Sequence, residues 1–131
     1  MEYGAGRLAR TIPRPSWPEA VVPMPANPAL IVLCTCPDLA VARRLARLAV
    51  AARHAACVNV IEGVSSVYAW QGEVCEDGEV LLVAKTTRAA YPALEAAWRE
   101  AHPYERPEVV AVDVACGSEP YLAWVGDSVS A

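Results

Sequence analysis

Two long β-forming segments, separated by three residues, dominate the middle of this sequence. Residues 57–70 are rich in Val, Tyr and Trp, residues 71–73 (Gln-Gly-Glu) have the composition of a hairpin turn, and residues 74–86 supply the returning strand. Fourteen extended residues at ~3.3 Å each span ~46 Å, whereas a compact domain of about 100 residues is roughly 34 Å across. The hairpin is therefore expected to project several residues beyond its own core.

The projecting end of the hairpin is apolar, because residues 64–70 include two valines, a tyrosine, an alanine and a tryptophan. A bare apolar ribbon is prone to edge pairing, and symmetric copies of the same chain would cover it. The alternative is a bend at Gly63 or Gly78 that returns the hairpin to its own sheet. We expect the oligomer, since the length mismatch favours it.

Strand and helix patterns alternate on both sides of the hairpin. The expected order is β-α-β-β-α-β, which predicts an α+β fold: a ferredoxin-like split sandwich, with both helices on one face of an antiparallel sheet. Before the hairpin we expect a strand at 29–35 and a helix opened by Pro37 and Asp38, whose apolar face carries Val41, Leu45, Leu48 and Ala52. After the hairpin we expect a helix over 87–101, capped by Thr87 and ended by His102-Pro103, and then a strand at 109–114. A short C-terminal helix follows from Ser118 to Gly126. Gly63 and Asp77-Gly78 are expected irregularities within the hairpin.

Proline divides the chain into two parts. Residues 1–28 hold six of the 11 prolines, so we expect a flexible extension there and a single domain over 29–131.

The composition of the chain excludes several classes of protein. A content of 55% hydrophobic and 20% charged residues excludes general disorder, and no apolar run reaches the roughly 18 residues of a membrane span. A net charge of −4 disfavours nucleic acid as a partner. An odd number of cysteines, five, without an export signal indicates reduced thiols in the cytoplasm.

Cys34 and Cys36 are separated by one residue at the end of the first strand. Strand geometry places both thiols on one face, close enough to share a soft metal such as Cu(I) or Zn(II), although cysteine is also a common core residue. His102 ends the second long helix, where it either interacts with the helix dipole or pairs with Cys34. The residues alone leave these alternatives open.

Residues 102–108 (His-Pro-Tyr-Glu-Arg-Pro-Glu) place an imidazole, a phenol and two carboxylates in seven positions, which is dense enough to suggest a site. The phosphate-loop, dinucleotide, nucleophile-elbow and zinc-protease motifs are all absent from the sequence. We therefore do not expect an enzyme.

The sequence resembles the CutA family of divalent-cation tolerance proteins over about residues 30–125. The matching stretches are IVLCTCPD (31–38), LA (45–46), AACVNVI (55–61), YAWQG (68–72), KTT (85–87), HPY (102–104), PE (107–108) and YLAW (121–124). The resemblance implies a tight homotrimer of ferredoxin-like subunits with hairpins paired between subunits, and a role in cytoplasmic tolerance of divalent metals, chiefly copper.

The resemblance also implies metal ligands, which fall on Cys34 and His102. Some family members carry a second histidine just before the latter, and this chain has Ala101 there, so Cys36 is a candidate replacement. The alternative is a trimeric signalling module similar to PII-type regulators, with a small molecule in the subunit clefts. Such a module would need a phosphate-binding loop, and only Lys85 and Arg88 near the second long helix provide basic groups.

Overall fold

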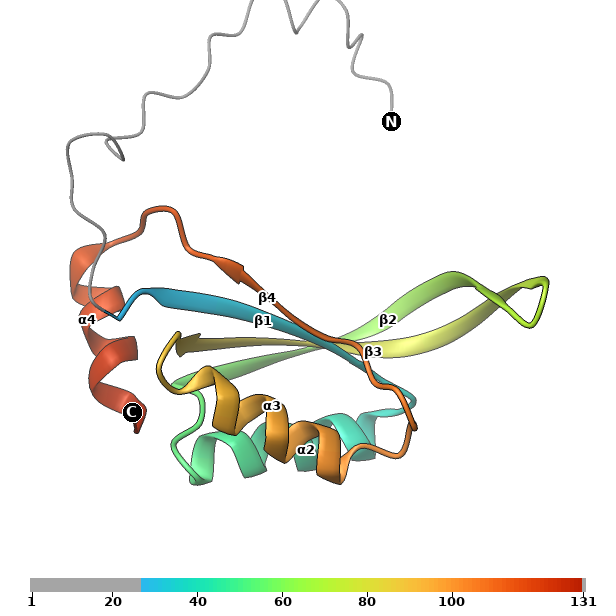
Figure 1. Ribbon diagram of the computed structural model, residues 1–131, viewed down its shortest axis with the longest axis horizontal. Helices are drawn as coiled ribbons and strands as arrows, with labels where there is room; N and C mark the ends of the chain where they lie inside the picture. Colours follow the sequence, from blue (N-terminus) through green and yellow to red (C-terminus); the bar gives the residue numbers. More distant parts are fainter. Residues whose placement is uncertain (1–26, 131) are drawn as a thin grey trace, which may run out of the picture.

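The computed structural model describes residues 27–130, and they form one four-stranded antiparallel sheet with two helices packed on one face and a third at its end (Figure 1). The strand order is β2-β3-β1-β4, so the ferredoxin-like prediction is confirmed. None of the helices within 27–130 has the length and hydropathy to cross a bilayer. The elements are β1 (Ala29–Cys36), α2 (Leu39–Ala51), β2 (Cys57–Trp70), β3 (Glu73–Thr87), α3 (Tyr91–Ala101), β4 (Val109–Asp113) and α4 (Glu119–Ser128).

The core lies between the sheet and helices α2 and α3. Trp98 of α3 is fully buried, and its indole Nε1 donates a hydrogen bond of 3.0 Å to the Leu45 carbonyl of α2, which joins the two helices. The expected apolar face of α2 is partly wrong, because Leu48 is exposed while alanines face the sheet. Small alanine side chains let α2 approach the sheet closely. The buried residues of α2 are Ala42, Leu45, Ala46 and Ala49.

The hairpin projects from the sheet as expected (Figure 1). Strand β3 pairs with β1 only from Val80 to Thr87, so its first seven residues pair with β2 alone. Gln71 and Gly72 form the turn with positive φ values of 51° and 80°, the geometry that suits the twist of a two-residue hairpin. The bulge expected at Gly63 is present, with φ at 80° and a register shift between Ile61 and Val64. The irregularity expected at Gly78 is wrong, since its pairing with Ser65 is regular.

The helix ends differ from several expectations. Asp38, and not Pro37, is the N-cap of α2, and its carboxylate accepts a hydrogen bond of 2.9 Å from the Val41 amide. Helix α3 begins at Tyr91, because Thr87 instead caps the preceding turn by accepting from the Ala90 amide.

Helix α4 continues past Gly126 to Ser128. Its last carbonyls, those of Asp127 and Ser128, accept hydrogen bonds from the guanidinium of Arg53, at 3.0 and 3.1 Å. Arg53 has a φ of 61°, a conformation that L-residues rarely adopt, and these bonds together with its own carbonyl's bond to Ser130 stabilise it. The helix thus ends where Arg53, in the turn that follows α2, donates hydrogen bonds to its last carbonyls.

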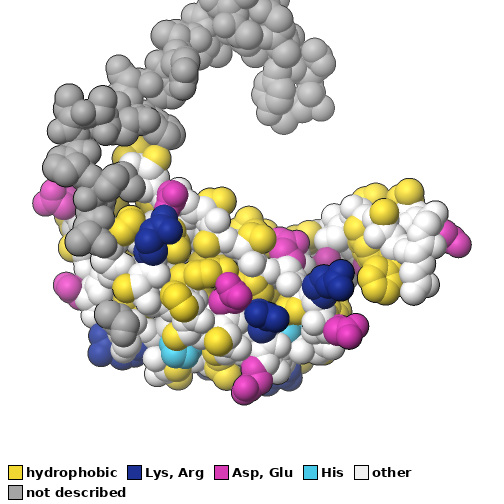
Figure 2. All heavy atoms as spheres, in the orientation of Figure 1, with side chains coloured by type: hydrophobic (Ala, Val, Ile, Leu, Met, Phe, Trp, Pro, Cys, Tyr) yellow, Lys and Arg dark blue, Asp and Glu magenta, His cyan; other side chains and the backbone are white. Residues whose placement is uncertain are grey.

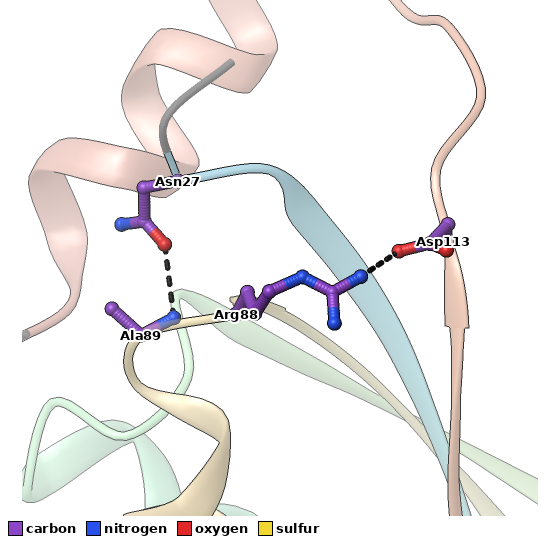
Figure 3. Close-up of polar contacts among 4 residues, drawn as sticks. All are labelled: Asn27, Arg88, Ala89 and Asp113. Carbon is purple, nitrogen blue, oxygen red and sulfur yellow. Dashed lines mark hydrogen bonds and ion pairs between the residues drawn. The ribbon is translucent and has the colours of Figure 1, made fainter. Parts of the chain in front are cut away.

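The start of the described chain is fixed to the sheet and to the β3–α3 turn (Figure 3). The Asn27 side chain accepts a hydrogen bond from the Ala89 amide, and the Pro28 carbonyl accepts one from the Arg88 amide, both at 2.9 Å. Arg88 in turn pairs with Asp113 of β4. The extension expected over residues 1–28 otherwise lies outside the described residues.

Gly63 and Gly78 form a matched pair for testing the bulge. A Cβ at either position meets no atom within 4 Å, but only Gly63 has a positive φ. We expect Gly63→Ala to lower the free energy of unfolding by about 1–2 kcal/mol through backbone strain, whereas Gly78→Ala should be neutral or slightly stabilising. Urea unfolding at one fixed protein concentration measures both, and equal effects of the two variants would contradict a strained bulge.

Candidate metal centre

Three buried side chains with soft or borderline donor atoms meet at the end of β1. Cys34 and Cys36 alternate along the strand, so both thiols face the helix-covered side of the sheet, and neither residue is exposed. His102, the C-cap of α3, is 7% exposed and lies against them. One ligand atom from each residue can be chosen such that all three lie within 4.8 Å of one another. The structure therefore brings together the two predicted ligands, Cys34 and His102, and the candidate replacement, Cys36.

Both ring nitrogens of His102 already have hydrogen-bond partners. Nδ1 accepts from the Tyr104 amide at 3.1 Å, so it carries no proton, and Nε2 therefore donates to the Thr35 carbonyl at 2.8 Å. No buried side-chain nitrogen or oxygen in residues 27–130 lacks a partner. The imidazole thus ties the start of the α3–β4 loop to β1, and a metal ion would have to take one nitrogen from these contacts.

The two thiols interact with each other. The neighbouring Cys36 side chain, followed by burial, raises the pKa of Cys34, and the neighbouring Cys34 side chain lowers the pKa of Cys36. The Cys34 thiol donates a long hydrogen bond of 3.8 Å to the Thr35 carbonyl. A cation bound between the two sulfurs would replace their protons.

The donor set fits a soft metal ion. Two sulfurs bound at about 2.3 Å to one ion lie at most about 4.6 Å apart, so the cluster needs only a small contraction. Thiolate and imidazole suit copper and zinc, while Mg²⁺ and Ca²⁺ prefer oxygen. The two sulfurs would be the main ligands of such an ion, and His102 would become a third ligand only by giving up a hydrogen bond.

A pocket of about 560 Å³ adjoins the cluster on the open side of the sheet. Thr35 contributes to its wall, and the hydroxyl of Tyr104 donates a hydrogen bond of 2.9 Å to Glu79 of the hairpin. A second phenol, Tyr68, donates to Asp77. The lining residues are Thr35, Tyr68, Trp70, Asp77, Glu79, Tyr104, Glu105, Arg106 and Glu108.

Comparison with known proteins decides the family. A family model described as CutA1 divalent ion tolerance protein matches residues 30–128. The chain belongs to the CutA1 family. The divalent-cation tolerance protein CutA of Thermus thermophilus is 47% identical over 98 residues, which are 75% of this chain and 95% of that protein. Human Protein CutA is 48% identical over 91 residues, 70% of this chain, and the match spans only 51% of the human protein.

Solved CutA1 structures share the architecture. The divalent cation tolerance protein of Thermus thermophilus superposes with a TM-score of 0.77 at 45% identity, covering 78% of this chain and 99% of that one. The structure of CutA1 from Oryza sativa also superposes with a TM-score of 0.77, at 37% identity, and the match covers 79% of this chain and 94% of the rice chain.

The sequence of this CutA1 chain pointed to only one side of the pocket. The density of polar groups in residues 102–108 marked the loop that carries Tyr104, but nothing marked Glu79 or Asp77. These carboxylates lie in the hairpin, and their approach to the loop depends on a bulge and on packing between distant segments. The available signal in 68–79 was two aromatic residues followed by four acidic ones, a composition typical of many exposed strands.

His102 should stabilise the metal-free CutA1 chain. We expect His102→Ala to lower the free energy of unfolding by roughly 1–3 kcal/mol, because two buried hydrogen bonds are lost and the Thr35 carbonyl loses this donor. His54→Ala, at a partly exposed position, is the control and should change stability less. Urea unfolding in the presence of a chelator measures both, and wild-type stability of His102→Ala would show that its ring makes no structural contribution.

Proposed function

We propose that this CutA1 chain acts in divalent-cation tolerance by binding copper, or another soft metal ion, at Cys34, Cys36 and His102. The observation that carries the proposal is the cluster of two sulfurs and one nitrogen within 4.8 Å, buried at the end of β1. The role is binding rather than catalysis. The cytoplasm is the proposed location, supported by the odd number of five cysteines, which suits a reducing compartment.

Burial determines what such a centre does. Thiolates shielded from water bind a soft cation strongly and exclude strongly hydrated ones, which would have to lose their water shells. The sulfur atoms hold the ion, and the imidazole adds a third donor that is oriented by the one hydrogen bond it keeps.

We further propose that the functional unit is a homotrimer. Apolar side chains from three strands and from the start of the hairpin lie on the open face of the sheet, and within the described residues no helix packs on it (Figure 1). Figure 2 shows hydrophobic side chains on the projecting hairpin as well. The hairpin end is similarly bare, with Val67 64%, Trp70 60% and Val74 80% exposed. Contiguous apolar surface of this kind is typical of a subunit interface. The open-face apolar residues are Ile31, Leu33, Ile61, Leu81, Val83, Val110 and Val112.

The alternative, a PII-like module that binds a phosphorylated ligand, finds less support. The two basic side chains that could bind a phosphate already have other partners, because Lys85 donates to the Asn59 side chain and Arg88 forms an ion pair with Asp113. The pocket beside Tyr104 has four carboxylates and one arginine, which repel an anion.

Copper binding tests the metal proposal. With Cu(I) supplied by a competing chromophoric chelator, we expect Cys34→Ser and Cys36→Ser each to reduce affinity more than tenfold, because each removes a thiolate. His102→Ala should have a smaller effect, since its nitrogen is already hydrogen-bonded.

Cys75→Ser is the control, as Cys75 lies in the projecting half of β3 and should not affect copper affinity. Unchanged affinity in the Cys34→Ser/His102→Ala double variant would contradict the proposed centre and locate copper elsewhere.

The trimer has its own test. Light scattering at micromolar concentration should give three times the 14.0 kDa chain mass. Val112→Glu, which places a charge on the open face, should dissociate the assembly, whereas Val50→Glu on the outer side of α2 should leave it intact. A wild-type monomer would refute the assembly, and dissociation by both variants would refute the assigned interface.

A further inference from the structure

The C-terminal end of α3, which places His102 next to the two thiols, is itself held by a residue of α2. Arg44 donates a hydrogen bond of 3.1 Å from its Nη2 to the carbonyl of Ala101, the residue immediately before His102. Carbonyls in the last turn of a helix have no partner within that helix. A guanidinium at this point satisfies one of them and interacts favourably with the negative end of the helix dipole.

Two hydrogen bonds fix the peptide group that joins Ala101 to His102. Its oxygen accepts from Arg44, and its N–H donates to the Trp98 carbonyl at 2.9 Å. Because the peptide group is planar and both of its polar atoms are engaged, it cannot rotate without breaking a hydrogen bond. It therefore sets the direction in which the His102 side chain leaves the backbone, at a residue whose extended conformation (φ −77°, ψ 139°) ends the helix.

Hydrogen bonds join α2 and α3 in both directions. The Arg44 side chain of α2 bonds to the backbone of α3, and the buried Trp98 indole of α3 donates to the Leu45 carbonyl of α2 at 3.0 Å. Both helices lie side by side on one face of the sheet, opposite the open face (Figure 1). The contact of Arg44 is therefore on the side of the sheet away from the proposed trimer interface.

The His102 imidazole depends on a fixed helix end, because its contacts tolerate little displacement. Its Nε2 donates to the Thr35 carbonyl at 2.8 Å. Hydrogen bonds of this type are confined to about 2.7–3.2 Å, and metal–ligand distances vary even less. A small shift of the α3 terminus would consequently weaken the ring's bond to β1 and displace the nitrogen from the two sulfurs.

We propose that Arg44 is a positioning residue for the candidate metal centre: it holds the peptide group before His102 and so presents the imidazole to the two sulfurs. The inference rests on the proposed function. It concerns the third donor alone, because both sulfurs are carried by β1 and do not depend on the end of α3. Arg44 acts through His102 and does not contact the ion.

Substitutions at Arg44 isolate the hydrogen bond. Arg44→Met keeps an aliphatic stem and removes the donor, whereas Arg44→Lys keeps a positively charged donor and should restore part of the effect. Arg47→Met is the matched control, because Arg47 is exposed on the same helix and, within residues 27–130, makes no hydrogen bond or ion pair to α3.

The metal-free chain gives the first readout. With a chelator present and isotope-labelled histidine and tryptophan, the ring signals are few, since the chain has two histidines and four tryptophans. We expect the Nε2 proton of His102 to exchange with solvent about fivefold faster or more in Arg44→Met, with Arg44→Lys in between and Arg47→Met unchanged. The Nε1 proton of the buried Trp98 is the internal reference, because a general loss of stability would accelerate both protons equally.

Copper affinity gives the second readout, through a double-mutant cycle with His102→Ala. We expect Arg44→Met to weaken Cu(I) binding by about threefold in the otherwise wild-type chain and to have no effect once His102 is replaced, because the arginine acts through the imidazole. Arg44→Lys should recover part of the lost affinity, and Arg47→Met should match wild type.

Three results would overturn the proposal. Equal acceleration of the His102 and Trp98 protons would show that Arg44 only joins the two helices. An equal loss of copper affinity with and without His102, or no loss in either case while the cluster binds copper, would show that Arg44 does not act through the imidazole. The proposed function fails on a different result, unchanged copper affinity in Cys34→Ser/His102→Ala, and the ring-proton measurement then decides by itself whether Arg44 positions His102.

Discussion

Strand β3 is the element on which the rest of the structure depends. Its C-terminal half pairs with both β1 and β2, whereas its N-terminal half pairs with β2 alone. From Val80 to Thr87 it lies between β1 and β2, and its alternate residues Leu82 and Ala84 are fully buried in the core. From Glu73 to Glu79 it has β2 alone beside it. The same strand thus anchors the helix-covered core and carries the acidic wall of the pocket.

Much of the fold could be predicted from local patterns. The alternation of strands and helices, the hairpin turn at 71–72 and the bulge at Gly63 follow from residue types that constrain the backbone within a few positions. The buried face of α2 was less predictable, because alanine occurs equally at surface and core positions. The end of α4 was not predictable, since it depends on Arg53, which lies more than seventy residues away in sequence.

The site shows the same division between local and distant determinants. Cys34 and Cys36 share a face by strand periodicity alone, but the residues left their approach to His102 open, because it depends on how the end of α3 packs against β1. The two hydrogen bonds that occupy the His102 ring could not be predicted, because one involves a backbone carbonyl 67 positions away. Those bonds give the histidine a structural role in the metal-free chain.

The residues held by His102 are also residues of the pocket. Nε2 bonds to the carbonyl of Thr35 and Nδ1 to the amide of Tyr104, and both residues line the cavity. An ion that took either nitrogen would release one of these backbone groups and so change the wall of the pocket. Thermodynamic linkage then requires reciprocity: anything that fixes the wall in its metal-free form would weaken the binding of the ion. A single imidazole thereby links the metal cluster to the shape of the pocket.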